Sequence, residues 1–181
     1  WGRIVAQIVY YFTAAVSLGS PHRAVNFVVP TGNFGDIFAG YAAKRMGLPI
    51  ANLVIATNAN DILARTLETG LYETGAVQPT ISPSMDIQIS SNFERLLFEA
   101  LGRDGDALKR LMNGLQQSGH FTVPAKALAT IRESFAAGRA SEAETSATIA
   151  ATLKQSGYLL DPHSAVGVSV ANRLDLGTAP V

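Results

Sequence analysis

The chain has 181 residues, of which 48% are hydrophobic and 15% are charged. This composition predicts one folded domain with a core and excludes a disordered tail. The formal net charge is zero, and no run of like charge indicates nucleic acid or an anionic membrane surface as a partner. The chain lacks cysteine, which excludes disulfides and thiol nucleophiles and favours a reducing, cytoplasmic location.

The first predicted element is an amphipathic helix that ends at Gly19, with Pro21 beyond it. Residues 4–19 are mostly apolar and uncharged, but they are fewer than the roughly 20 residues that a membrane span needs. Their polar side chains fall on one stripe, so we predict packing against a core and no membrane contact. Because Trp1 begins directly within this pattern and residues 177–181 add no closing element, we expect both ends to be cuts in a longer chain.

Residues 24–70 follow the pattern of an α/β crossover unit. The apolar runs at 24–30 and 51–57 are typical of strands that are buried on both faces of a parallel sheet. A helix is predicted after each strand, at 37–46 and at 61–69. The order strand, helix, strand, helix predicts an open, mostly parallel sheet with flanking helices.

The second half of the chain is predicted to be rich in helix. Residues 71–90 contain one glycine and two prolines, so we expect a loop with at most one strand, near 86–90. We therefore divide the chain into an α/β segment, 1–90, and a mainly helical segment of the same domain, 91–181. The expected helix starts are a Ser91–Glu94 capping box, residue 105, Pro124, a Ser141–Glu144 capping box, and Asp161 followed by Pro162, with the last helix reaching Leu174.

The loop at 30–36, PTGNFGD, carries the clearest chemical signal. Gly32 and Gly35 let the backbone wrap closely around an anion, and the following helix start offers free N–H groups and a positive dipole end. The loop also follows a strand, at the edge where open α/β sheets bind ligands. It lacks the Lys-Ser/Thr pair of nucleoside-triphosphate loops and the three-glycine dinucleotide spacing. From the pattern alone, a phosphate cradle and a tight structural turn both remain open, and Asp36 would repel a phosphate unless it serves the helix start.

Other polar residues have simpler interpretations. No group of His, Asp and Glu has metal-ligand spacing, so we predict no metal site. We interpret His163 as part of a capped helix start, and Ser82, Ser84 and Asp86 as turn-forming residues on a loop that could also reach a substrate.

Four segments resemble a known family when they are taken together and in order. They are VNFVVPTGNFGDIFAGYAAKRMGLP at 25–49, ATNANDI at 56–62, SPSMDIQISSNFERLLFE at 82–99 and GYLLDPHSAVGV at 157–168. This series resembles the threonine synthases of the bacterial and fungal type, over nearly the whole chain.

The resemblance implies a fold type II enzyme that depends on pyridoxal 5'-phosphate (PLP). Such a lyase converts O-phospho-L-homoserine and water into L-threonine and phosphate in threonine biosynthesis. The matching loop residues implied to hold the PLP phosphate are Gly32, Asn33, Phe34, Gly35 and Asp36. Asn58, Asn60 and Asp61 follow the next strand and are candidate neighbours of the active site.

The resemblance also implies that the lysine that forms the imine with PLP lies before this segment. We reject the lysines present as candidates, namely Lys44, Lys109, Lys126 and Lys154. We therefore assign no catalytic residue to the chain and expect the isolated piece to be inactive without the remainder of its parent. Two alternatives stay open: another fold type II PLP enzyme that acts on a different amino acid, and a non-catalytic phosphate-binding module.

Overall fold

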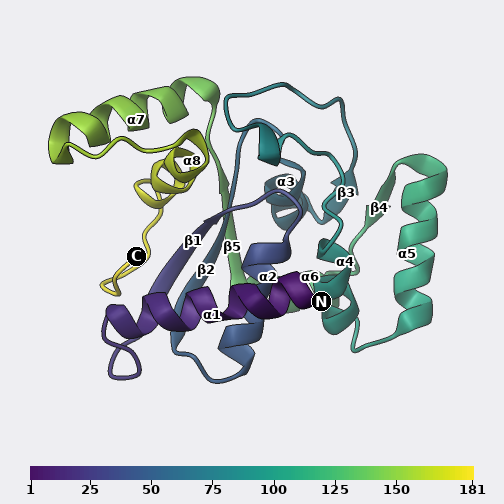
Figure 1. Cartoon of the computed structure of the whole chain (residues 1–181). Helices are drawn as coiled ribbons and strands as arrows, with labels where there is room; N and C mark the ends of the chain where they lie inside the picture. The colour runs from purple at the N-terminus through teal and green to yellow at the C-terminus, as the bar shows by residue number, and fades with distance from the viewer.

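A computed structural model describes residues 1–181 and has an α/β architecture (Figure 1). Its main sheet is parallel, with the strand order β1-β2-β5. The strands of this sheet are β1 (Val25–Pro30), β2 (Ile50–Thr57) and β5 (Phe135–Arg139). A separate antiparallel pair joins β3 (Leu71–Glu73) to β4 (His120–Thr122). The predicted open, mostly parallel sheet with flanking helices is confirmed.

Helices account for much of the remaining chain, and most of them lie after residue 90 (Figure 1). The α-helices are α1 (Gly2–Ser17), α2 (Gly35–Arg45), α3 (Ile62–Thr69), α4 (Phe93–Ala100), α5 (Gly105–Ser118), α6 (Ala125–Ser134), α7 (Glu142–Ser156) and α8 (Pro162–Ala171). A short 3₁₀ helix, η1 (Pro83–Met85), lies in the long connection between β3 and α4. No helix combines the length and the apolar character that crossing a membrane requires.

The central strand β2 is buried on both faces, as its apolar sequence predicts. Leu53 and Ile55 belong to the large hydrophobic core that includes α1 and α2. Val54 and Ala56 point to the opposite face, where they belong to a smaller cluster with residues of α8. The alternation of side chains along the strand therefore places α1 and α2 on one side of the sheet and α8 on the other.

Helix α1 packs mainly against α2 and buries one side of its surface. Ile4 and Tyr11 are buried and Ile8 is partly buried, so core packing of this helix is confirmed. Val9 and Val16, on the same helix, are exposed.

The largest error in the sequence interpretation concerns β5, since residues 135–139 were assigned to a helical stretch. Its sequence, FAAGR, has weak strand character, but it pairs with β2 from Leu53↔Phe135 to Thr57↔Arg139. Gly138 suits this position because a Cβ there would lie 2.7 Å from a methyl carbon of Val170 on α8. The close approach of α8 to the sheet explains the glycine.

Several smaller assignments also change. The strand expected near 86–90 is absent, and the strand in this region is β3, at 71–73. Helix α4 begins at Phe93 after Asn92 without a side-chain cap, so the predicted Ser91–Glu94 capping box is wrong. Pro124 is the residue before α6 and not its first residue, and α8 ends before Leu174.

Other predicted helix starts are confirmed. Ser141 and Glu144 form a complete capping box at the start of α7. Asp161 caps α8 by accepting hydrogen bonds from the amides of His163 and Ser164, and Pro162 is its first residue.

Candidate active site at the end of strand β1

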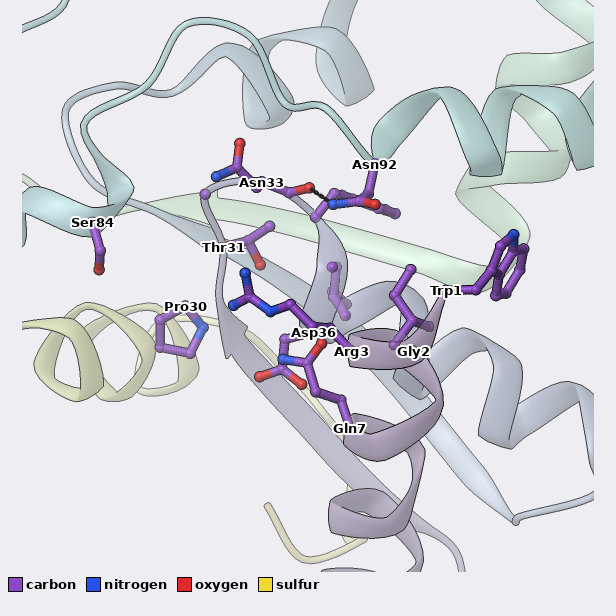
Figure 2. Close-up of a pocket in the computed structure, with 15 residues that line it drawn as sticks. Trp1, Gly2, Arg3, Gln7, Pro30, Thr31, Asn33, Asp36, Ser84 and Asn92 are labelled. Atoms are coloured by element: carbon purple, nitrogen blue, oxygen red, sulfur yellow. Dashed lines mark hydrogen bonds between the residues drawn. The ribbon is translucent and has the colours of Figure 1, made fainter.

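A pocket of about 530 Å³ lies where β1 ends and α2 begins (Figure 2). The loop 30–36 forms one side of the pocket, and the first two turns of α1 form another. Ile37 of α2, Ser84 of η1 and Asn92 complete the lining. The pocket therefore lies at the carboxyl end of a parallel strand, the usual ligand position in open α/β sheets.

The loop enters α2 through a left-handed residue, Phe34, with φ 64° and ψ 3°. A phenylalanine side chain has no hydrogen-bonding atom, and the start of α2 has no side-chain cap. The first amides of a helix have no partner within the helix, and the dipole is positive there. The amides at 35–37, beside the pocket, are therefore suited to an anion.

The aromatic ring of Phe34 holds this backbone conformation in place. Phe34 is 1% exposed, and its ring packs against those of Phe93 and Phe135 with centroid distances of 5.4 and 5.7 Å. A left-handed backbone is uncommon for a large residue and costs about 1–3 kcal/mol. Burial of the ring between α4 and β5 offsets this cost, so the core determines the position of the loop.

Hydrogen bonds from the 90–92 segment fix the other side of the loop. Ser90 Oγ donates to the main-chain oxygen of Gly32 at 2.8 Å. Asn92 Nδ2 donates to the main-chain oxygen of Asn33 at 2.9 Å (Figure 2). A Cβ at Gly32 would lie 2.9 Å from the main-chain oxygen of Ser84. Gly32 is therefore required because the η1 backbone passes directly against the loop.

Arg3, Gln7 and Asp36 place charge and hydrogen-bonding groups in the pocket. Figure 2 shows the Arg3 side chain extending from α1 toward Thr31 at the loop. Partial burial raises the pKa of Asp36 above its ordinary value, although the side chain keeps contact with water. The sequence interpretation missed Arg3, because a single arginine on an amphipathic helix has the pattern of a solvated side chain.

The structure brings all five predicted loop residues, Gly32 to Asp36, together in this pocket. It does not bring Asn58, Asn60 or Asp61 into the pocket lining. Asn58 and Asn60 are buried and bond to the connection that carries η1. Asp61 instead forms ion pairs with Arg65 and Arg139, on the far side of β2 from β1.

Other residues considered from the sequence lie elsewhere. None of the four lysines lines the pocket. His163 Nδ1 lies 3.2 Å from Asp161 Oδ1 at the start of α8, which agrees with its interpretation as part of a capped helix start.

No protein-family model matches the chain. Curated relatives match over most of it. The threonine synthase of Pseudomonas aeruginosa is 52% identical over 94% of this chain and 36% of its own length. The threonine synthase of Saccharomyces cerevisiae is 47% identical over 96% of this chain and 37% of its own length.

Solved structures agree closely with the fold. A PLP-bound threonine synthase from Brucella melitensis has a TM-score of 0.98 and 67% sequence identity, over 99% of this chain and 39% of that one. The yeast threonine synthase structure has a TM-score of 0.91 and 45% identity, over 96% of this chain and 37% of that one.

The fold is therefore that of part of a fold type II PLP enzyme. Within this class the chain is homologous to the threonine synthases, as its sequence motifs predict. It spans little more than a third of the length of the relatives that it matches.

Proposed function

We propose that this chain forms the PLP-phosphate-binding part of a threonine synthase. The proposed parent enzyme converts O-phospho-L-homoserine and water into L-threonine and phosphate, as a carbon–oxygen lyase acting on phosphate in the cytoplasm. The observation that carries the proposal is the glycine loop at the start of α2, which lines a pocket at the carboxyl end of β1. The homology to threonine synthases supports this assignment.

The residues present are compatible with a phosphate group. Gly32 and Gly35 keep the loop backbone accessible, and the uncapped start of α2 supplies amide donors. Asn33 is exposed and lines the same pocket. PLP, when bound, supplies an electron sink for the reaction, and this chain would hold and orient it through its phosphate.

Arg3 adds the positive charge that the loop itself lacks. A guanidinium matches the geometry of a phosphate and forms strong charge-assisted hydrogen bonds with it. Its position opposite the loop allows it to balance Asp36, which lines the same pocket. Arg3 would therefore bind a phosphate group of the cofactor or of the substrate.

We propose that the lysine that forms the imine with PLP lies in the remainder of the parent chain. None of the lysines of this chain lines the pocket. The partners of this chain are therefore the rest of the enzyme, PLP and the small phosphorylated substrate. We expect the isolated 181 residues to be inactive.

The test is release of phosphate and threonine from O-phospho-L-homoserine by the full-length enzyme, with and without PLP. We expect release of both products only when PLP is present. Binding of PLP with a shifted absorbance but no product would indicate a fold type II enzyme with another amino-acid substrate. Phosphate binding without any binding of PLP would instead identify a non-catalytic module.

A further inference from the structure

A partly buried polar network lies next to the phosphate loop and centres on the carboxylate of Asp86. Asp86 Oδ1 accepts hydrogen bonds from Thr80 Oγ1 at 2.6 Å, Asn58 Nδ2 at 2.8 Å and Asn60 Nδ2 at 3.0 Å. Asp86 Oδ2 accepts one from the main-chain amide of Thr80 at 2.8 Å. One carboxylate therefore joins the end of β2 to both ends of the 80–86 segment.

The two asparagines extend the network along this connection. Asn58 is completely buried, and its Nδ2 also donates to Ser82 Oγ at 2.9 Å. Asn60 is 3% exposed and bonds to both the main-chain oxygen and the amide of Gln78, at 2.8 Å each. Such groups are costly to bury without partners, so the connection is held in one position by bonds that are all made together.

The position of this connection determines the position of one side of the pocket. Asp86 directly follows η1, whose Ser84 lines the pocket. The main-chain oxygen of Ser84 would lie only 2.9 Å from a Cβ at Gly32. The side chain of Met85, in the same turn, is 3% exposed and packs with Val54 and Ala56 of β2. A shift of η1 would therefore move the backbone against which Gly32 rests.

We propose that Asp86, together with Asn58 and Asn60, is a positioning residue that holds η1 against the phosphate loop and so keeps the loop in its phosphate-binding conformation. This inference rests on the proposed function. Asp86 does not line the pocket, so its effect passes through Ser84 and Gly32. A network that only stabilised the fold would affect phosphate binding and every other property of the site equally. A network that positions the loop would affect phosphate binding selectively, and this contrast makes the proposal testable.

The experiment compares the affinities of the full-length enzyme for PLP and for pyridoxal, which lacks the phosphate, by absorbance titration. The first variant is Asp86→Asn, which keeps the size of the side chain. It replaces one carboxylate oxygen with an NH₂ group that cannot accept hydrogen bonds from the surrounding donors. The second is Thr80→Val, which removes one hydroxyl and keeps the main-chain bond to Asp86. The control is Asp106→Asn, an exposed carboxylate in the first turn of α5.

We expect Asp86→Asn to weaken PLP binding about 10-fold and Thr80→Val about 3-fold, as for the loss of charged and neutral hydrogen bonds, with pyridoxal binding unchanged. The control, Asp106→Asn, should bind PLP and pyridoxal with the same affinities as the wild type. Equal weakening of PLP and pyridoxal, or no weakening of either, would overturn the inference. If Asp86→Asn fails to fold, the ratio of the two affinities in Thr80→Val decides the question.

The wild-type enzyme separates this inference from the proposed function. A wild type that does not bind PLP overturns the proposed function and the inference together. A wild type that binds PLP, with an Asp86→Asn variant of the same affinity, overturns the inference alone.

Discussion

The ring of Phe34 meets that of Phe93 edge-on, with the centroids 5.4 Å apart and the planes at 75°. Phe34 belongs to the loop before α2, whereas Phe93 is the first residue of α4. The contact therefore joins the proposed phosphate loop directly to the hydrophobic core. It allows a large side chain to occupy a left-handed position that a short loop would ordinarily give to glycine.

Substitution of Phe34 tests this relationship. Phe34→Ala should lower the free energy of unfolding by about 3–5 kcal/mol, because a buried ring is lost. Phe34→Gly should be more stable than Phe34→Ala by about 1 kcal/mol, because glycine tolerates the left-handed backbone. Urea denaturation of both variants measures the difference. An alanine variant more stable than the glycine variant would contradict the left-handed conformation of this residue.

A methyl group at Gly32 should disturb the site without a change in backbone preference. Gly32→Ala would bring a Cβ to 2.9 Å from the main-chain oxygen of Ser84, so the loop or η1 must shift. We expect PLP affinity of the full-length enzyme to fall by about 10-fold or more, which corresponds to about 1.4 kcal/mol. Gly105→Ala is the matched control, because nothing lies within 4 Å of its new Cβ. An unchanged PLP affinity in Gly32→Ala would show that the η1 backbone can move away from the loop without a cost to binding.

The hydrogen bond from Asn92 to Asn33 makes a smaller contribution. Asn92→Ala removes the Nδ2 bond at 2.9 Å but keeps the main-chain bond at 3.0 Å to the same oxygen. We expect a loss of about 1 kcal/mol, or about 5-fold in PLP affinity. Asn113→Ala, at an exposed position in α5, provides the control in the same absorbance titration. A loss of PLP affinity equal to that of the control would show that the Asn92 side chain does not support the loop.

Asp86 predicts a specific dependence of stability on pH. Burial acts to raise the pKa of Asp86, but hydrogen bonds from Thr80, Asn58 and Asn60 outweigh it and hold the pKa below its ordinary value. A lowered pKa in the folded state means that this carboxylate stabilises the protein above about pH 4 and loses its effect as the pH falls through the folded-state pKa. Asp86→Asn should therefore be less stable than the wild type at pH 7, with the gap narrowing toward pH 3 in denaturant titrations. A gap that does not depend on pH would show that the charge contributes nothing.

Sequence reasoning predicted β1, the loop and α2 because each has a strong local pattern. The apolar run of β1 is followed by two glycines and then by a helical segment, and the structure keeps this order. Strand β5 has no such pattern, since Phe135 is its only large apolar residue and it contains Gly138 and Arg139. Its strand conformation arises from pairing with β2, which depends on tertiary context and not on local propensity.

The site could be predicted only in part for a similar reason. Asn58 and Asn60 follow the end of a strand, which predicted a position near the pocket, but their side chains turn toward the connection that carries η1. Arg3 lines the pocket because α1 packs against α2. The local sequence predicts that α1 packs against a core, but it does not predict which element it contacts. The assignment of Gly32 to Asp36 to the cofactor phosphate stays a prediction, as does the division of the chain at residue 90.

The position of β5 in the sheet has a consequence for the order of folding. Thr57 and Gly138 are in contact across the β2–β5 pair although 81 residues separate them in the chain. Closing so long a segment carries a larger entropic cost than pairing β1 with β2, so β5 should join the sheet late. Because Phe135 of β5 packs against Phe34, the loop gains its last aromatic support only at that step. In a refolding time course, recovery of PLP binding should therefore lag behind the formation of helix.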